Sequence, residues 1–324
     1  MQNNLTIAIC AYNSANVIEE TLACVLKQTF QEFDLLIIND CSSDNTFNVV
    51  QDFLKKNKRQ FKLINLEENK GIANARQLAL IEAKTKYLLF IDSDDLPHPS
   101  LVKKQYEMII SDKNIIAVSS WLRYIDEKGD KLKGGFFIGS RTKEEFDSLA
   151  RREKLIFLPI QTLFNREIAL QVGGFRLDNF PIGKPRYRDF CEDLDLWTRM
   201  SDLYKDGKYI ITIPEVLYYY RKGNEGVSSN AVAMSLKMKF IKKNLKLRRA
   251  GFNEIYFNDF IETVTAAEID QLHKNARAGY FLRNGFFLLK DKKFIKGTYY
   301  LSKSIFMNPE QFMQKLKANS GLLK

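Results

Sequence analysis

Short apolar runs alternate with amphipathic stretches along the first 125 residues of the chain. The runs read LTIAIC, DLLIIN, FKLINL, KYLLFI and IIAVSS, at residues 5–10, 34–39, 61–66, 86–91 and 115–120. Apolar runs of this length that end in turn residues are typical of strands buried on both faces of a sheet. The pattern therefore predicts five strands in this part of the chain.

The stretches between these runs carry apolar residues at helical spacing. In the first of them, one helical face collects Val17, Ile18, Leu22, Val25 and Leu26. We expect Asn16 to cap that helix and Glu19 to complete a capping box. Two further helices are predicted, one from about residue 42 and one after Gly71.

Strand and helix in alternation, joined by short loops, predict an α/β fold with a mostly parallel central sheet covered by helices on both faces. The pattern loosens after about residue 125 into turn-rich stretches. Within that part, residues 191–207 are expected to form an amphipathic helix and residues 208–221 one or two strands.

The chain changes character near residue 230, where the pattern turns mostly helical. From residue 231 to the end there are eighteen Lys and Arg residues against seven Asp and Glu, so the whole net charge of +11 lies there. We therefore expect two domains, at residues 1–230 and 231–324, the second being a C-terminal helical extension. A basic appendage predicts an anionic partner surface, such as a membrane, a nucleic acid or a polyanionic substrate; the alternative is a solvated helical face.

Composition narrows the class of protein. Hydrophobic residues make up 45% of the 324 residues and charged residues 27%, which is ordinary for a globular protein. The four cysteines form no CxxC pair and there are two histidines, so reduced thiols are expected in place of a zinc site. The N-terminus lacks the pattern of a signal peptide, and no apolar run approaches about 18 residues, so a cytoplasmic location without a membrane-spanning helix is expected.

Polar residues gather where the predicted strands end. The ends read CAYN, NDCSSDN, ENKG and DSDD, at residues 10–13, 39–45, 68–71 and 92–95. In open α/β sheets, ligands bind outside the carboxyl ends of the strands. This edge of the sheet is therefore the candidate functional site.

The last of these ends concentrates negative charge in Asp92, Asp94 and Asp95. In an extended segment, Asp92 and Asp94 would face one side and Asp95 the other. Two neighbouring carboxylates suit Mg²⁺ or Mn²⁺, which take hard oxygen ligands from one or two carboxylates and from substrate phosphates. The alternative is a solvated turn before the prolines that follow.

Several motifs occur in an order typical of one enzyme family. They are IAICAYNSANVIEETLACVLKQTF, LLIINDCSSDNT, NKGIANAR, FIDSDD, GGF and CEDLDLWTR, and the resemblance covers about residues 5–230. The ordered set resembles glycosyltransferase family 2 of the inverting, bacterial type, whose catalytic domain has the Rossmann-like, nucleotide-sugar-binding fold called GT-A. Neither GxGxxG nor GK[ST] occurs, which argues against a dinucleotide-binding dehydrogenase and a P-loop enzyme.

The resemblance implies a nucleotide-sugar site, made of Ala11, Tyr12, Glu19, Asp40, Arg76, Asp92 and Ser93. Ala11 and Tyr12 would pack on the base, and the acceptor-only carboxylate of Asp40 would receive the N–H of the base. The guanidinium of Arg76 would lie near the diphosphate. The alternatives are a capping role for Glu19, an N-cap role for Asp40 and a surface salt bridge for Arg76.

The resemblance also assigns the metal and the base. Asp92 and Asp94 match the DxD pair that would hold Mn²⁺ or Mg²⁺ against the diphosphate, Asp94 being the surer direct ligand. Asp193, with Glu192 second, matches the carboxylate that removes the proton of the acceptor hydroxyl. The alternative is that both acids merely complement the dipole of a helix N-terminus. Trp197 is expected in the core.

The chain departs from the family pattern in two places. Cys10 and Cys41 stand where the family often has proline and glycine. Many members also carry a histidine that YYRKGNEGVSS lacks, since Gly223 and Asn224 occupy that region; Lys222 or Arg221 could supply the positive charge there.

Together these features imply a metal-dependent, inverting hexosyl- or N-acetylhexosaminyltransferase that uses a nucleotide sugar, and we expect this donor to be a UDP-sugar. The acceptor, a glycan or a lipid-linked acceptor in surface polysaccharide synthesis, would meet residues 159–167 and 173–190. The basic helices would lie on an anionic membrane at the inner face of the plasma membrane, or form a homodimer; nucleic acid is not an expected partner. A sugar nucleotidyltransferase and a non-catalytic nucleotide-sugar-binding module are the alternative functions.

Overall fold

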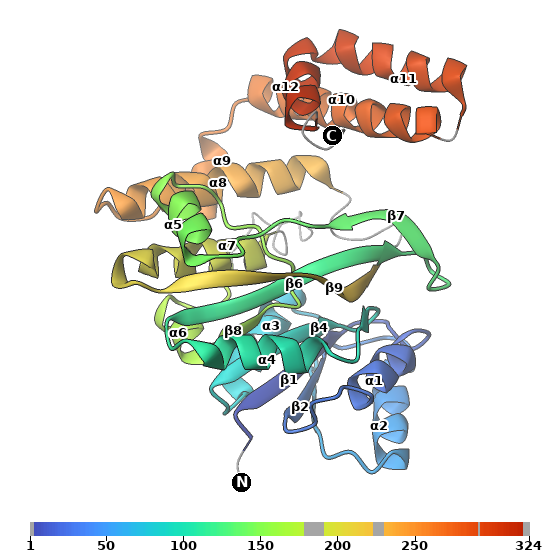
Figure 1. Cartoon of the computed structure of the whole chain (residues 1–324), viewed down its shortest axis with the longest axis vertical. Helices are drawn as coiled ribbons and strands as arrows, with labels where there is room; N and C mark the ends of the chain where they lie inside the picture. Colours follow the sequence, from blue (N-terminus) through green and yellow to red (C-terminus); the bar gives the residue numbers. More distant parts are fainter. Residues whose placement is uncertain (1–2, 178–190, 223–229, 291, 320–324) are drawn as a thin grey trace. The chain divides into compact units, whose positions relative to one another are not determined.

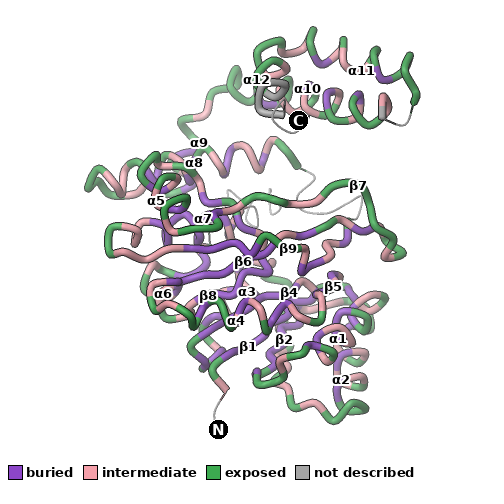
Figure 2. Tube along the Cα trace, in the orientation of Figure 1, coloured by how far each residue is buried: buried purple, intermediate pink, exposed green. Residues whose placement is uncertain are grey.

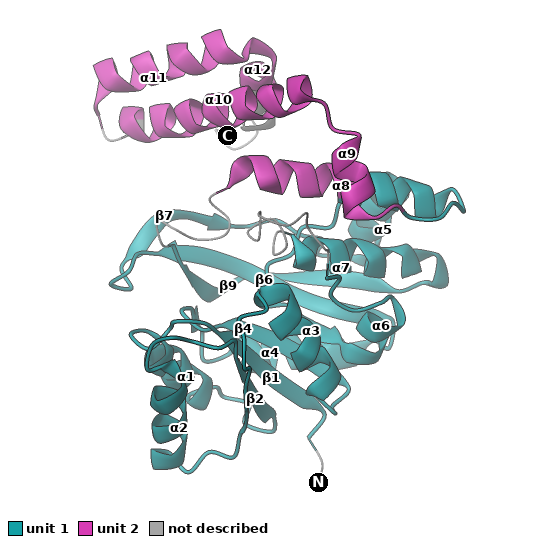
Figure 3. Ribbon diagram, turned by 180° about the vertical axis from the view of Figure 1, so that it is seen from behind, with its two compact units in different colours: residues 1–229, 241–254 teal, residues 230–240, 255–324 magenta. Residues whose placement is uncertain are grey.

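The computed structural model describes residues 3–177, 191–222, 230–290 and 292–319 (Figure 1). Two compact units divide the chain, one of residues 1–229 and 241–254 and the other of residues 230–240 and 255–324 (Figure 3).

Nine strands form one sheet among the described residues of the first unit. Their bounds are β1 Leu5–Ala11, β2 Asp34–Asn39, β3 Lys62–Asn65, β4 Tyr87–Asp92, β5 Leu96–Pro97, β6 Ile115–Ile125, β7 Lys131–Phe136, β8 Leu163–Asn165 and β9 Tyr209–Arg221. The strand order is β3-β2-β1-β4-β8-β6-β9-β5, with β7 beside β6. Strands β3, β2, β1 and β4 run parallel, as do β6 and β9, while β8 is antiparallel to both of its neighbours.

Helices cover both faces of this sheet. Their bounds are α1 Ile18–Leu26, α2 Thr46–Lys56, α3 Ile72–Glu82, α4 Leu101–Ser111, α5 Lys143–Arg151, α6 Arg166–Gln171 and α7 Glu192–Met200, the last continued by a 3₁₀ turn at Ser201–Asp206. Side chains of β1 alternate between two cores: Ile7 and Ile9 pack in the core that includes residues of α1, α2 and α4, whereas Ala8 and Cys10 pack in the core that includes residues of α3, α5, α6 and α7. The predicted α/β architecture is confirmed, and the buried central strands are visible in Figure 2.

The predicted elements and the observed ones agree best where the sequence is most periodic. All five predicted strands are present, as β1, β2, β3, β4 and β6, and residues 209–221 form the single strand β9.

The prediction of a capping box at the start of the first helix is wrong. Helix α1 follows Val17 without any side-chain cap, because the carbonyl oxygen of Ser14 accepts the backbone N–H groups of Val17 and Ile18.

The second unit is helical. It contains the first part of α8 (Ala231–Arg249), then α9 (Phe257–Glu262), α10 (Ala266–Lys290), α11 (Phe294–Met307) and α12 (Pro309–Asn319). Helices α10 and α11 pack closely, because glycines at the crossing leave room for Leu301 beside Gly285 and for Leu289 beside Gly297. Within the described part of the chain, no helix is both long and apolar enough to cross a membrane.

Candidate active site

Arg76 joins the two acidic motifs that lie far apart in the sequence. Its side chain, buried on α3, donates from Nη2 to Asp92 Oδ1 at 2.8 Å and from Nη1 to Glu192 Oε1. Asp92 ends β4 and Glu192 begins α7, so one guanidinium bridges the DxD segment and the second acidic pair. The structure thus brings together Arg76, Asp92 and the Glu192–Asp193 pair at the carboxyl end of the parallel strands.

Charges in this cluster alter the pKa of several groups. Burial alone would lower the pKa of Arg76, but the charges of Glu192 and Asp92 outweigh it and raise the pKa above its ordinary value. Burial raises the pKa of Asp193, although the nearby charge of Arg76 opposes the shift. Glu192 is therefore committed to Arg76, while Asp193 is a carboxylate with increased affinity for a proton.

Helix α7 begins abruptly at these acids. Cys191, the residue before Glu192, has a φ of +57°, and the Oδ1 of Asp193 accepts the backbone N–H of Leu194 at 2.7 Å. Cys41 has a φ of +54° in the loop after β2. Non-glycine residues adopt this left-handed region infrequently, and such residues gather at functional loops. The family glycine expected at position 41 fits this backbone conformation.

The acidic segment after β4 is a turn. The N–H of Asp95 approaches the carbonyl oxygen of Asp92 at 3.3 Å, so the expectation of an extended segment with alternating carboxylates is wrong. Burial, with the charge of Asp92, raises the pKa of Asp94 to about 6. Burial and the charges of Asp92 and Asp94 raise the pKa of Asp95 well above its ordinary value. Three carboxylates therefore crowd one turn, and Asp95 is the one that is fully buried.

Residues that sequence analysis did not single out hold this turn in place. Thr21 of α1 donates to the carbonyl oxygens of Ser93 and Asp95, at 3.0 and 2.9 Å. Tyr218 of β9 accepts the backbone N–H of Asp92 at 3.1 Å through its hydroxyl group. Because these contacts come from elements far away in sequence, no local motif could have indicated them.

Arg221 at the end of β9 makes the most extensive contact with the turn. Its backbone N–H donates to Asp95 Oδ1 at 2.7 Å, and its Nε donates to the carbonyl oxygen of Asp94 at 2.8 Å. The guanidinium also reaches the carbonyl oxygen of Glu127 at 2.6 Å and the carboxylate of Glu20 at 2.5 Å. These bonds commit the guanidinium to the protein itself. Arg221 is one of the two cations expected in place of the family histidine, and in the structure it holds the acidic turn in position.

The other candidate, Lys222, lies with Nζ 5.0 Å from the centre of the Tyr124 ring. Gly223 and Asn224 fall outside the described residues, as do residues 178–190 of the expected acceptor region. The described acceptor stretch at 159–167 contributes β8 to the sheet and is largely buried.

The residues expected around the base lie at the ends of β1 and β2. Ala11 is buried and its carbonyl oxygen accepts the N–H of Asp40, whereas the Tyr12 side chain is 51% exposed and free to contact a ligand. Asp40 does not cap α2, which begins at Thr46. Instead, its carboxylate accepts the backbone N–H groups of Lys70 and Gly71, at 2.8 and 2.9 Å, and so connects β2 to the start of α3.

Two further predicted residues take different positions. Glu19 is exposed in the first turn of α1. Ser93 is buried, and its Oγ lies 2.7 Å from that of Ser14. Trp197 is fully buried, with its ring centre 5.2 Å from that of Phe164, which makes it a core residue.

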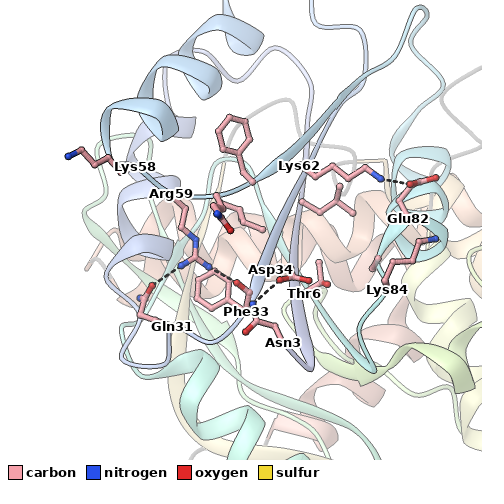
Figure 4. A pocket seen from close by; sticks show the side chains of 15 residues that line it. Asn3, Thr6, Gln31, Phe33, Asp34, Lys58, Arg59, Lys62, Glu82 and Lys84 are labelled. Carbon is pink, nitrogen blue, oxygen red and sulfur yellow. Dashed lines mark hydrogen bonds and ion pairs between the residues drawn. The ribbon is translucent and has the colours of Figure 1, made fainter. Parts of the chain in front are cut away.

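A separate cavity of about 640 Å³ lies at the opposite edge of the sheet (Figure 4). Residues at the starts of strands line it, among them Thr6, Asp34 and Lys62. Lys62 pairs with Glu82 at 2.6 Å, and Asp34 accepts the side-chain amide of Asn3 at 2.8 Å. The cavity lies at the amino ends of the parallel strands, whereas the acidic turn follows the carboxyl end of β4, so the two are far apart.

The acidic turn has the donor chemistry of a divalent-cation site. Asp92 and Asp94 offer hard oxygen ligands. The pKa of Asp94 is raised mainly by burial and in part by the charge of Asp92. Among the described residues, no group of three or more His, Cys, Asp and Glu side chains is arranged to hold a metal ion. An ion bound to Asp92 and Asp94 would need its remaining ligands from elsewhere, such as a diphosphate and water.

Known proteins resemble this chain in sequence and in fold. The family described as Glycosyl transferase family 2 has a model that matches residues 6–177. TuaG of Bacillus subtilis (strain 168), whose name assigns it to teichuronic acid biosynthesis, is 28% identical over 236 residues, which cover 73% of this chain and 86% of TuaG.

Solved structures with a similar fold include two in complex with a nucleotide sugar. S. aureus TarS 1–349 in complex with UDP-GlcNAc has a TM-score of 0.56 at 18% identity, covering 97% of this chain and 92% of that one. The mannosyltransferase PcManGT from Pyrobaculum calidifontis, in complex with GDP-Man and Mn²⁺, has a TM-score of 0.54 at 17% identity, covering 99% and 81%. At such identities these likenesses show the fold, which is GT-A with C-terminal helices.

Proposed function

Because this chain belongs to glycosyl transferase family 2, we propose that it transfers a sugar, with inversion, from a nucleotide sugar to a hydroxyl group of a glycan or lipid-linked acceptor. One observation carries the proposal: Arg76 bonds both Asp92 and Glu192, so the acids of the DxD turn and of α7 meet at one site. The transferred group is proposed to be a hexose or N-acetylhexosamine, and the pathway surface polysaccharide synthesis, as the name of TuaG suggests for that relative.

The donor is proposed to be a UDP-sugar. Tyr12, half-exposed at the end of β1, would stack on the base, and Asp40 would receive an N–H of the base through a remaining lone pair of its carboxylate. Solved relatives carry UDP-GlcNAc in one case and GDP-Man in the other, so the fold accommodates both bases.

Asp92 and Asp94 would hold Mn²⁺ or Mg²⁺. When bound, such an ion supplies positive charge to the diphosphate as it departs. Arg76 keeps Asp92 in place through their ion pair, and its guanidinium stays positively charged at every pH at which the protein is folded. Arg221 and Thr21 fix the backbone of the turn, so the carboxylates are positioned before the donor binds.

Asp193 is proposed as the general base, with Glu192 positioned by Arg76. As the acceptor oxygen attacks the anomeric carbon, its proton passes to the carboxylate of Asp193, and the bond between that carbon and the diphosphate oxygen breaks. Attack from the face opposite the leaving group inverts the anomeric centre. The raised pKa of Asp193 suits this task, since a stronger base accepts a proton more readily near neutral pH.

The test is a screen of UDP-, GDP- and CDP-sugars by thermal shift and donor hydrolysis, with and without Mn²⁺. The proposal expects Mn²⁺-dependent stabilisation and turnover with one class of donor. Asp94→Ala and Asp193→Ala should both abolish turnover, while only Asp94→Ala should weaken Mn²⁺-dependent binding of the nucleotide. Binding without turnover of any donor would support a binding module instead, and formation of nucleotide sugar from sugar phosphate a nucleotidyltransferase.

The acceptor sets the place of action. A lipid-linked acceptor would require the enzyme to work as a peripheral protein at the inner face of the plasma membrane, with the basic C-terminal helices toward the anionic lipid. The competing role for these helices is a homodimer contact.

A further inference from the structure

Helix α11 of the second unit is apolar on two opposite sides. One side packs on α10, where Gly297 contacts Leu289 and the Oγ of Ser304 donates to the carbonyl oxygen of Ala278 at 2.8 Å. Both Gly297 and Ser304 are buried. This side accounts for the hairpin that α10 and α11 form in Figure 1.

The other side of α11 carries large apolar side chains in solvent. Ile295 is 90% exposed, Tyr299 53% and Phe306 91%. Their spacing of four and seven residues places them on one face of the helix, about half a turn away from Gly297 and Ser304. The row extends about 16 Å along the helix axis. A soluble surface seldom leaves such a row uncovered, so the face marks an interaction site.

Charge along the hairpin indicates what covers this face. Across the hairpin, residues 266–307, the sequence has eight Lys and Arg residues against three acids, Glu268, Asp270 and Asp291, and α11 itself has no acid. Lys296 and Lys303 follow one flank of the row, and the Lys303 Nζ lies 4.7 Å from the centre of the Tyr299 ring. An apolar row with aromatic rings and a lysine flank has the chemistry of a helix that lies in the plane of an anionic bilayer.

We propose that the outer face of α11 docks on an anionic phospholipid membrane, with Ile295, Tyr299 and Phe306 in the interfacial region and Lys296 and Lys303 on the headgroup phosphates. A second copy of the chain fits less well, since a symmetric contact between two α11 faces would bring lysines together without an acid of α11 to pair with them. The proposal rests on the proposed function for its purpose, which is to bring the enzyme to a lipid-linked acceptor.

The test measures sedimentation of the full chain with vesicles of phosphatidylcholine alone and of equal parts phosphatidylcholine and phosphatidylglycerol. Wild type should bind only the anionic vesicles. Ile295→Ser/Phe306→Ser and Lys296→Glu/Lys303→Glu should each weaken this binding about tenfold or more. The matched controls Ile110→Ser/Phe252→Ser and Lys55→Glu/Lys56→Glu alter exposed residues of the first unit and should bind like wild type. Circular dichroism confirms that each variant folds.

Three results would overturn the docking site: equal binding to both kinds of vesicle, unchanged binding by the α11 variants, or a concentration-dependent dimer that the α11 variants abolish while vesicle binding is absent. Donor hydrolysis, measured on the same variants, should stay at the wild-type level. Failure of vesicle binding with intact hydrolysis would count against this docking site alone, and loss of all donor turnover in wild type would count against the proposed function alone.

Discussion

The Nε of Arg221 donates a hydrogen bond of 2.8 Å to the carbonyl oxygen of Asp94, across 127 residues of sequence. The bond ties the end of β9 to the turn that carries the candidate metal ligands. The same guanidinium bonds the carbonyl oxygen of Glu127 and the carboxylate of Glu20, so three segments of the chain meet at one buried fork. Arg221 therefore acts on the site by positioning the turn, without a place for substrate on its guanidinium.

Arg221→Lys should weaken metal-dependent activity without removing the charge. An ammonium group lacks the planar fork and cannot bond Asp94 and Glu127 in the observed geometry. Groups that hold metal ligands in place typically contribute about 10–100-fold to metal affinity. We expect the Mn²⁺ concentration for half-maximal donor hydrolysis to rise by about that factor. Lys56→Met, at an exposed lysine of α2, is the control and should leave the Mn²⁺ dependence unchanged; an unchanged dependence in Arg221→Lys would remove the positioning role.

Arg76→Met should destabilise the folded protein. The substitution removes the cation from the buried carboxylate of Glu192 and the part-buried carboxylate of Asp92, and breaking a buried pair in this way costs about 3–5 kcal/mol. Urea unfolding at neutral pH measures the loss. Lys62→Met breaks the exposed pair with Glu82 and should have little effect on the free energy of unfolding. Equal effects of the two substitutions would mean that the Arg76 cluster contributes no more than a surface pair.

The resemblance to the family predicted that the two acidic motifs share one site. The strand pattern by itself placed only the DxD turn, which follows β4, at the carboxyl ends of the strands, since Glu192 begins a helix. The GGF motif also has a physical basis in the structure. Gly174 has a φ of +62°, and a Cβ there would lie 2.4 Å from the Oε1 of Gln77, which accepts the N–H of Phe175. Glycine at this position suits both the left-handed backbone conformation and the close approach of Gln77, which explains why a local sequence motif marks it.

Contacts that depend on the register of distant strands were not predictable. Arg221 and Tyr218 reach the acidic turn only because β9 pairs with β5 next to it, with Leu96 opposite Tyr219. Asp40 was considered as a ligand for the base or a helix cap, yet its carboxylate bonds Lys70 and Gly71, which a single sequence does not place beside it. The capping box at Glu19 failed because the carbonyl oxygen of Ser14 satisfies the first N–H groups of α1.

Glu254 should make the stability of the first unit depend on pH. Burial alone would raise its pKa, but hydrogen bonds from Arg176 and Arg248 outweigh it and lower the pKa below the ordinary value. A lowered pKa in the folded state stabilises the protein above the unfolded value of about 4.3, and the contribution is lost as pH falls through the folded value.

Glu254→Gln should therefore reduce the free energy of unfolding by about 1–3 kcal/mol at neutral pH, since it replaces charge-assisted bonds with neutral ones. Urea unfolding of both proteins at successively lower pH should show this difference shrinking below about pH 4. Glu262→Gln, an exposed acid of the second unit, is the matched control and should have little effect at any pH. A difference that persists undiminished into the acid range would contradict a charge-based role.

Asp193 should set the acidic limb of the activity profile. Burial raises its pKa above the value of about 3.9 of an ordinary aspartate, so the carboxylate becomes protonated, and unable to accept a proton, at a higher pH than usual. The kcat/KM of donor hydrolysis should consequently fall at a higher pH than it would for an ordinary aspartate. Thermal shift follows the binding of UDP and Mn²⁺ separately over the same pH range.

Asp193→Asn keeps the side-chain shape but removes the base, and it should lower kcat by about 10²–10⁴-fold while UDP binding stays intact. The remaining activity of Asp193→Asn should lose the part of that limb that Asp193 sets, and any limb that persists should follow the loss of Mn²⁺ binding, since Asp94 of the acidic turn also has a raised pKa. If the variant turns over at the wild-type rate, or keeps a limb that does not follow Mn²⁺ binding, the base lies elsewhere and Glu192 becomes the group to test.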